Sequence, residues 1–369
     1  MSERIYLDCA AATPVDDDVF AAALPYYKDV FYNPSSMHAS GQAAAAAVER
    51  AREECATAIG ASPSEIYFTS GGTEAINWAM NELPQGKTHV VVSAIEHDAV
   101  LVCAERLKKR GYTVDEVKPD ARGIITPEAL KNLVREDTGL VCVMAVNNIV
   151  GSVQPIKSLA RIAHAAGALF FTDAVQAVNS IDINVGDWDV DMLAVSAHKF
   201  YSVKGAGFLY VKSGVKTTPL LCGGEQERGL RAGTVDVPAV VAMGAAIKKA
   251  SAFRNEYNAH ARAVKTAFLS ALAYGKPVTC AHNTDDIVSV VFDGINGGRL
   301  AVALSCAGVC ASVGSACSAG SATPPKTLTE MGVENADCSV RFSFGKCVDV
   351  DQARAAASIV NAVAERFLK

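Results

Sequence analysis

The chain has 369 residues, of which half are hydrophobic and a fifth are charged, and its formal net charge at pH 7 is −5. This composition is ordinary for a globular enzyme, and the acidic balance argues against nucleic acid or an anionic membrane as the main partner. The length exceeds what one compact core usually holds, so we expect about two domains.

The sequence shows no targeting or membrane-spanning pattern. No apolar signal segment follows Met1-Ser2-Glu3-Arg4, and the longest apolar runs, such as 140–146, are too short to cross a bilayer. We therefore expect a cytoplasmic protein that makes no membrane contact.

The eleven cysteines are odd in number and form no Cys-x-x-Cys motif. Most of them are expected to be small buried hydrophobic residues rather than parts of a disulfide framework. A metal cluster among the five late cysteines is an alternative, but their spacing matches no zinc or iron–sulfur pattern. We predict no metal site.

Helical and strand patterns alternate from about residue 42 to residue 250. Helices are predicted over 42–59 and 73–81 and from Thr126-Pro127 onward, where Thr is the N-cap and Pro the first helical residue. Strands are predicted over 65–70, 89–93, 140–146, 169–172 and 192–196. Such alternation indicates a mostly parallel sheet that helices cover on both faces.

The order changes after residue 237. A long helical stretch is predicted over 237–273, leading out of the first domain. Beyond it, the patterns predict strands and helices in a mixed order, which indicates a smaller α+β domain. The strands are predicted over 287–292, 309–312 and 340–344, and the helices over 300–306 and 351–367.

Lys199 follows the predicted strand 192–196 almost directly, in Ser196-Ala197-His198-Lys199. A lysine at a sheet end lies close to the interior, where desolvation lowers its pKa and makes the amine a usable nucleophile. A Schiff-base lysine needs this property. Taken alone, the position is better explained by an ordinary surface lysine, and only the residues at the other strand ends favour the nucleophile.

Polar residues follow the other predicted strands as well. Gly72-Thr73 begins a helix after a glycine turn, which suits a phosphate, although a tight turn alone explains it. His97 and Asn148 follow two further strands, and a lone histidine is often structural. Asp173 is either a helix N-cap or the charge partner of a buried group. Parallel sheets bind ligands at such carboxyl ends.

These residue types fit one cofactor. Pyridoxal phosphate needs a lysine, an acid against its pyridine nitrogen, a phosphate seat and a flat group stacked on its ring. The candidates are Lys199, Asp173, Gly72, Thr73, Ser196, His198 and His97.

With these residues in view, the chain resembles the cysteine desulfurases of the NifS/IscS kind, which are class V, fold-type I pyridoxal-phosphate enzymes. The resemblance covers nearly the whole chain. Its motifs include Tyr6-Leu7-Asp8, Asn33-Pro34-Ser35-Ser36, Ser70-Gly71-Gly72-Thr73-Glu74, Glu96-His97, Asn147-Asn148, Asp173-Ala174-Val175-Gln176, His198-Lys199, Glu227-Arg228-Gly229, Gly314-Ser315-Ala316-Cys317 and Val340-Arg341-Phe342-Ser343.

The resemblance implies a large cofactor-binding domain over 15–255, with a seven-stranded sheet, and a small domain over 256–369 together with 1–14. It also implies a role for each site residue. Lys199 would bind the cofactor covalently, Asp173 would pair with its ring nitrogen, and Gln176 would bond its phenolic oxygen. His97 would stack on its ring and act in catalysis by moving protons. The remaining roles are phosphate binding by Gly72, Thr73, Ser196, His198 and, from the other subunit of a homodimer, Thr234, and substrate-carboxylate binding by Asn148 and Arg341.

Cys317 lies in a long segment of small, polar and glycine residues without a core face, which indicates an exposed loop. A cysteine there is poorly explained by packing. The resemblance implies that its thiolate takes sulfur from L-cysteine as a persulfide, leaves L-alanine, and passes the sulfur to an acceptor for iron–sulfur cluster assembly or tRNA thiolation.

Some positions depart from the family pattern. Cys9 stands where Asn is usual, Ile149 replaces a Glu, and Ser202-Val203 replaces Gly-Pro. Two alternatives stay open: a selenocysteine or cysteine-sulfinate lyase or another class V enzyme on the same fold, and a non-catalytic protein that kept the fold.

Overall fold

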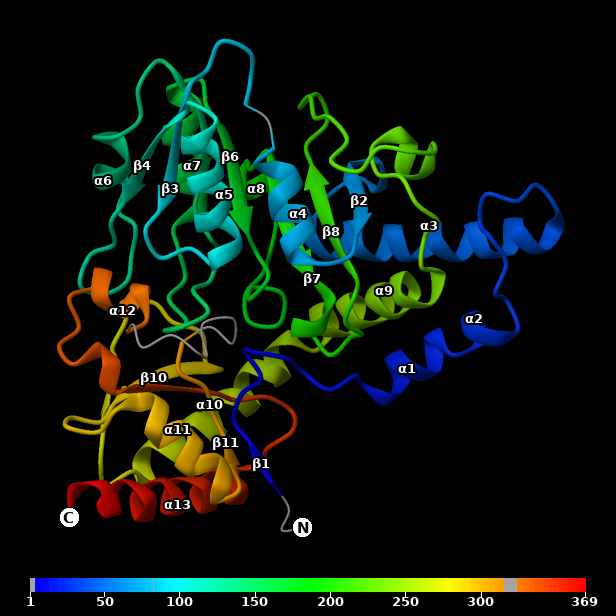
Figure 1. Cartoon of the computed structure of the whole chain (residues 1–369). Helices are drawn as coiled ribbons and strands as arrows, with labels where there is room; N and C mark the ends of the chain where they lie inside the picture. The colour runs from blue at the N-terminus through cyan, green and yellow to red at the C-terminus, as the bar shows by residue number, and fades with distance from the viewer. Residues whose placement is uncertain (1–3, 82, 315–323) are drawn as a thin grey trace.

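The computed structural model describes residues 4–81, 83–314 and 324–369, which form a large α/β part and a smaller α+β part (Figure 1). The helices of the large part are α1 (Asp17–Ala23), α2 (Pro25–Lys28), α3 (Ala39–Ile59), α4 (Gly72–Ala79), α5 (Asp98–Lys109), α6 (Pro127–Lys131), α7 (Ile156–Ala165), α8 (Val185–Trp188) and α9 (Val237–Ala252). Its strands are β2 (Ile66–Thr69), β3 (His89–Ser93), β4 (Thr113–Val117), β5 (Thr138–Cys142), β6 (Leu169–Asp173), β7 (Met192–Ser196) and β8 (Gly207–Val211).

The seven strands form one sheet in the order β2-β8-β7-β6-β5-β3-β4. Strands β4, β3, β5, β6 and β7 are parallel, and β8 is antiparallel to both of its neighbours. This confirms the predicted mostly parallel α/β fold. The sequence did not predict β4, an edge strand with polar and half-buried residues, or β8, which returns from β7 without an intervening α-helix.

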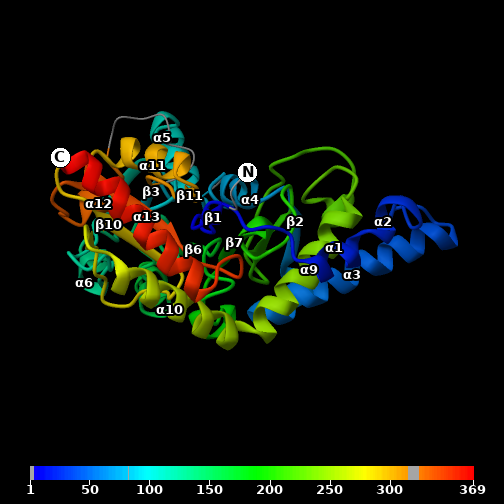
Figure 2. The ribbon, with the colours of Figure 1, turned by 90° about the horizontal axis from the view of Figure 1, so that it is seen from below.

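Helices cover both faces of this sheet. Val91 and Leu193 pack toward the layer that contains α3, α7 and α9, whereas their neighbours Val90 and Met192 pack toward α4 and α5. Successive strand residues point to opposite faces, so a strand buried on both sides needs a continuous apolar run. The view from below shows α3 and α9 side by side on their face (Figure 2).

The predicted helical stretch over 237–273 is helical almost throughout, but it is divided into two helices at Phe253. Phe253 has φ −113° and ψ 23°, outside helical values, and separates α9 from α10 (Arg254–Ala271). Helix α9 packs on α3 of the large part, whereas α10 packs on α13 (Val350–Leu368) of the small part. One straight helix could not follow both partners.

The small part has its own buried cluster, which includes Leu7, Phe268 and Phe342. Strand β1 (Ile5–Tyr6) pairs with β11 (Val309–Cys310), so the N-terminal residues belong to this cluster. The division at residues 255 and 256 stays a prediction. The other elements are β9 (Lys276–Pro277), β10 (Ile287–Val291), α11 (Gly297–Cys306), α12 (Lys326–Glu330) and β12 (Ser339–Ser343).

Local signals were accurate where capping chemistry is explicit. Thr126 accepts a hydrogen bond from Ala129 N and Pro127 is the first residue of α6, as predicted. Strand β5 ends at Cys142, earlier than the predicted 140–146, although the Val143 and Ala145 N–H groups still donate to carbonyls of β6. Within the described ranges, no helix combines the length and the apolar character needed to cross a membrane.

Candidate functional site

The polar residues predicted at the strand ends meet in one cavity of about 200 Å³ at the carboxyl edge of the parallel strands. All but one of the residues proposed for cofactor binding line it, as does Arg341. The lining residues are Ala10, Ala11, Gly72, Thr73, Ile76, His97, Met144, Asn148, Asp173, Val175, Gln176, Ser196, His198, Lys199 and Arg341.

Lys199 ends a short 3-10 turn after β7, and its amine is held by backbone carbonyls. Nζ donates to Ala10 O at 2.5 Å and to Ala11 O at 2.9 Å, and Gln176 Nε2 donates to Ala10 O at 2.7 Å. Thr13 N donates to His198 O, which ties the same segment to the turn. Ala10, Ala11 and Thr13, for which the sequence predicted no site role, therefore orient the lysine.

Asp173 is a buried carboxyl group at the end of β6. Its Oδ1 accepts from Val175 N at 2.9 Å, and no helix begins there, so it is not an N-cap. Burial raises the pKa of Asp173, while the Val175 N–H and the charges of His97 and Lys199 oppose this shift. A cation placed against Asp173 would stabilise its ionised form.

Glu96 is a second buried carboxyl group near Asp173, and the sequence did not single it out for a role of its own. Oε1 accepts from Met144 N at 2.7 Å. Burial, and then the negative charge of Asp173, raise the pKa of Glu96 to about 8. Its position directly before His97, just after a strand, is the sequence signal that could have identified Glu96 as a site residue.

The N-terminus of α4 and the end of β7 form one wall of the cavity. The first N–H groups of a helix have no partner within the helix, so they can bind an anion. A Cβ atom on Gly72 would lie 2.8 Å from Val175 Cγ2 and 3.4 Å from Ser196 Cβ, so only glycine fits without rearrangement. This narrow seat fits a phosphate group.

His198 and Ser196 lie 2.9 Å apart, from Nδ1 to Oγ. Burial, and then the charges of Lys199 and Lys204, lower the pKa of His198 to about 4. The imidazole is therefore neutral at physiological pH and contributes hydrogen bonding rather than charge.

His97 has a structural role as the N-cap of α5, because its Nδ1 accepts a hydrogen bond from Ala99 N at 3.1 Å. Its ring also lines the cavity. A neutral His97 carries its proton on Nε2, since Nδ1 acts as an acceptor.

Arg341 lies on β12 of the small part and is only 2% exposed. It lines the cavity together with residues of the large part. Nη1 donates to Asn148 O at 2.9 Å, and Nη2 donates to Asp8 Oδ1 at 2.9 Å. Ser312 Oγ donates to Asp8 Oδ2 at 2.7 Å. The sequence did not predict this partner of Arg341, because 333 residues separate it from Asp8.

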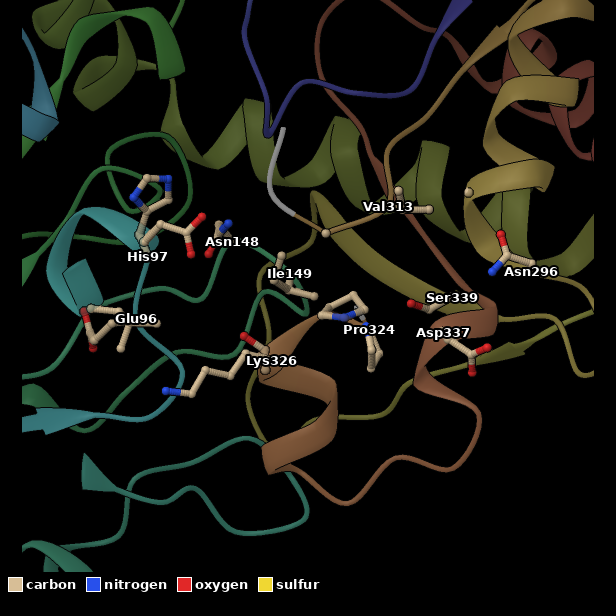
Figure 3. Close-up of a pocket in the computed structure, with 16 residues that line it drawn as sticks. Glu96, His97, Asn148, Ile149, Asn296, Val313, Pro324, Lys326, Asp337 and Ser339 are labelled. Atoms are coloured by element: carbon tan, nitrogen blue, oxygen red, sulfur yellow. The ribbon is translucent and has the colours of Figure 1, made fainter. Parts of the chain in front are cut away.

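A second pocket of about 350 Å³ shares His97 and Asn148 with the cavity. Figure 3 shows these two side chains on one side of it and Asn296 and Asp337 on the other. Val313 and Gly314, which precede the undescribed residues 315–323, line it too, as do Pro324 and Pro325, which follow them. Ile149, the departure from the family pattern, packs here against α12.

Two proposed site residues are not placed in the cavity. Thr234 is exposed and does not line it, and its expected role is toward a second subunit. Cys317 lies outside the described residues. Among the described residues, no group of three or more His, Cys, Asp or Glu side chains could hold a metal ion.

Comparisons with known proteins identify the family of this chain. Residues 5–355 match the family Aminotransferase class-V. Cysteine desulfurase IscS of Methanosarcina thermophila is 40% identical, over 94% of this chain and 88% of its own.

Two solved structures are also similar. A NifS-like protein has a TM-score of 0.92 and 34% identity, over 98% of this chain and all of its own. The structure of SspA in complex with cysteine has a TM-score of 0.79 and 33% identity, over 92% of this chain and 99% of its own. The chain therefore belongs to the class V aminotransferase family and, within it, to the cysteine desulfurases of the NifS/IscS kind.

Proposed function

We propose that the protein is a pyridoxal-phosphate-dependent cysteine desulfurase that converts L-cysteine to L-alanine and transfers the sulfur to an acceptor thiol. One observation carries the proposal: the Lys199 amine, the buried Asp173 carboxyl group and the N-terminus of α4 line a single cavity in a chain of this family. These are the three groups that the cofactor requires.

The residues of the cavity fit the cofactor. Lys199 would hold it covalently, Asp173 would pair with its ring nitrogen, and Gln176 and His97 would contact the ring. Gly72, Thr73, Ser196 and His198 would bind its phosphate, with Thr234 of a second subunit completing the seat. When bound, pyridoxal phosphate supplies the electron sink that acidifies the Cα proton of an amino acid.

Arg341 and Asn148 would bind the substrate carboxylate. A guanidinium pairs bidentately with a carboxylate, and Arg341 is already desolvated in this position. The carbonyls of Ala10 and Ala11 direct the Lys199 amine, which would move the Cα proton once it is released from the cofactor.

Cys317 would attack the substrate sulfur as a thiolate. The sulfur–carbon bond then breaks, the sulfur stays on Cys317 as a persulfide, and protonation of the remaining three-carbon fragment gives L-alanine. The persulfide passes its outer sulfur to the acceptor. We propose a homodimer that takes L-cysteine as substrate and serves iron–sulfur cluster assembly or tRNA thiolation.

The test is turnover of L-cysteine with three readouts: L-alanine, the visible absorption of the bound cofactor, and the mass of the peptide that contains Cys317. We expect alanine formation and a persulfide on that peptide. Lys199→Ala should lose the absorption band, whereas Cys317→Ser should keep the band and lose sulfur transfer.

Full turnover by Cys317→Ser would contradict the desulfurase mechanism and favour a lyase. Purified protein that neither absorbs visible light nor takes up added pyridoxal phosphate would contradict both enzyme functions.

A further inference from the structure

A pair of thiols lies beside the cavity and has no part in the proposed reaction. Cys9 is buried and directly precedes Ala10 and Ala11, whose carbonyls hold Lys199. Cys347 is half-buried and lies in the turn after β12. Both are free thiols, and Cys9 Sγ lies against Gly345, two residues before Cys347.

The surrounding backbone keeps the two residues together. Cys9 N donates to Ser343 O at 3.4 Å, and Val348 N donates to Gly345 O across the turn at the same distance. A Cβ atom on Gly345 would lie only 2.7 Å from Cys9 Sγ, so the missing side chain leaves room for this thiol against the turn. The Lys346 N–H donates to Tyr201 Oη at 2.8 Å and holds the turn in place.

The two thiols differ chemically. The interaction with Cys9 and the charge of the neighbouring Lys346 lower the pKa of Cys347, although partial burial opposes them. The interaction with Cys347, and then burial, raise the pKa of Cys9. Cys347 is thus suited to attack and Cys9 to act as the second, resolving thiol.

We propose that Cys9 and Cys347 form a redox pair that small disulfides, such as cystine, oxidise to an intrachain disulfide. The Cys347 thiolate attacks one sulfur of cystine, forms a mixed disulfide and releases one cysteine. Cys9 then loses its proton and attacks the Cys347 sulfur, which releases the second cysteine. Two protein thiols are oxidised, and one cystine is reduced to two cysteines.

The disulfide links the segment that holds Lys199 to a loop of the small part. It joins residues on opposite sides of the contact between β12 and the N-terminal segment, where Asp8 pairs with Ser343. This inference does not depend on the proposed function, because neither thiol lines the cavity.

The test uses the full-length Cys317→Ser protein, so the thiol proposed for sulfur transfer cannot react. After incubation with cystine, the protein thiols that remain free are alkylated, and the protein is digested with trypsin without reduction. Cys9 and Cys347 are each the only cysteine in their peptides, 5–28 and 347–354. We expect these peptides joined, two hydrogens lighter than their sum, in most of the protein, and separated again by a reducing thiol.

Matched variants locate the bond. Cys347→Ala in the same background should lose the joined peptide, and Cys222→Ala, which removes an exposed thiol elsewhere, should keep it. Alkylated peptides 5–28 and 347–354 without the joined product would overturn the proposal. Cystine left on Cys347 as a stable mixed disulfide, or a bond from Cys9 to Cys310, would also overturn it.

Discussion

The buried ion pair between Arg52 of α3 and Glu227 provides a sharp test of how the large part is held together. Two hydrogen bonds of 2.7 Å join the guanidinium to the carboxylate, and Phe68 N donates to the same carboxylate at 2.8 Å. Both side chains are at least 96% buried. Glu227 and Arg228 have positive φ values of 48° and 59°, a strained backbone that the pair helps to hold.

Glu227→Gln should lower the free energy of unfolding by about 3 kcal/mol. Breaking a buried pair by neutralising one partner costs about 3–5 kcal/mol, because it leaves a desolvated charge without compensation. We expect the lower end of this range, since Arg52 keeps the carbonyl of Ile66 and the exposed carboxylate of Glu49. Removing the charge of Arg52 as well should recover about 2 kcal/mol relative to the sum of the two single changes.

The assay is urea unfolding followed by tryptophan fluorescence. The only two tryptophans, Trp78 and Trp188, lie in the large part, so the signal reports its unfolding. Glu54→Gln is a matched control, because Glu54 also lies on α3 but pairs with the exposed Lys248, and the loss should be about 1 kcal/mol or less.

The reasoning fails if Glu227→Gln costs no more than the Glu54 control. It also fails if the changes at Arg52 and Glu227 are additive, because the two side chains would then be uncoupled.

Three further predictions concern the cavity. Glu96 keeps its proton in the folded protein up to about pH 8 but loses it near pH 4.5 when unfolded, so wild-type stability should fall as pH rises through this window, by up to about 1.4 kcal/mol per pH unit. The measurement is the melting temperature as a function of pH, and Glu96→Gln should make its fall with rising pH less steep. The same fall in the variant as in the wild type would show that Glu96 does not cause it. Arg341→Met should raise the KM for L-cysteine about tenfold to a hundredfold, since a charged hydrogen bond contributes about 1.5–3 kcal/mol; an unchanged KM in steady-state kinetics would remove Arg341 from the substrate site. Gly72→Ala should lower the affinity for pyridoxal phosphate about tenfold in an absorbance titration, or about 1.4 kcal/mol, because the added Cβ meets the Val175 side chain. Adding Val175→Ala should restore the affinity, and a double variant that binds no better than Gly72→Ala would contradict this explanation.

Much of the fold was predictable because its signals are local. Fully buried strands such as β6 and β7 require continuous apolar runs, and Thr126-Pro127 satisfies the first turn of a helix by its own chemistry. The bend at Phe253 had no such signal, because it depends on which elements α9 and α10 pack against.

The sequence by itself determined the family, the α/β class and most of the residues that line the cavity, because those side chains follow the strands that place them. Only the tertiary structure decided what surrounds them. The carbonyls that hold the Lys199 amine lie 188 and 189 residues away, and a backbone carbonyl has no residue identity to read from a sequence. Asp8 reaches Arg341, and Cys9 reaches Cys347, because β1 and the residues after it pack into a part of the molecule formed mainly by the C-terminal third of the chain. Contacts over such separations depend on how two hydrophobic cores meet, and no local pattern encodes that.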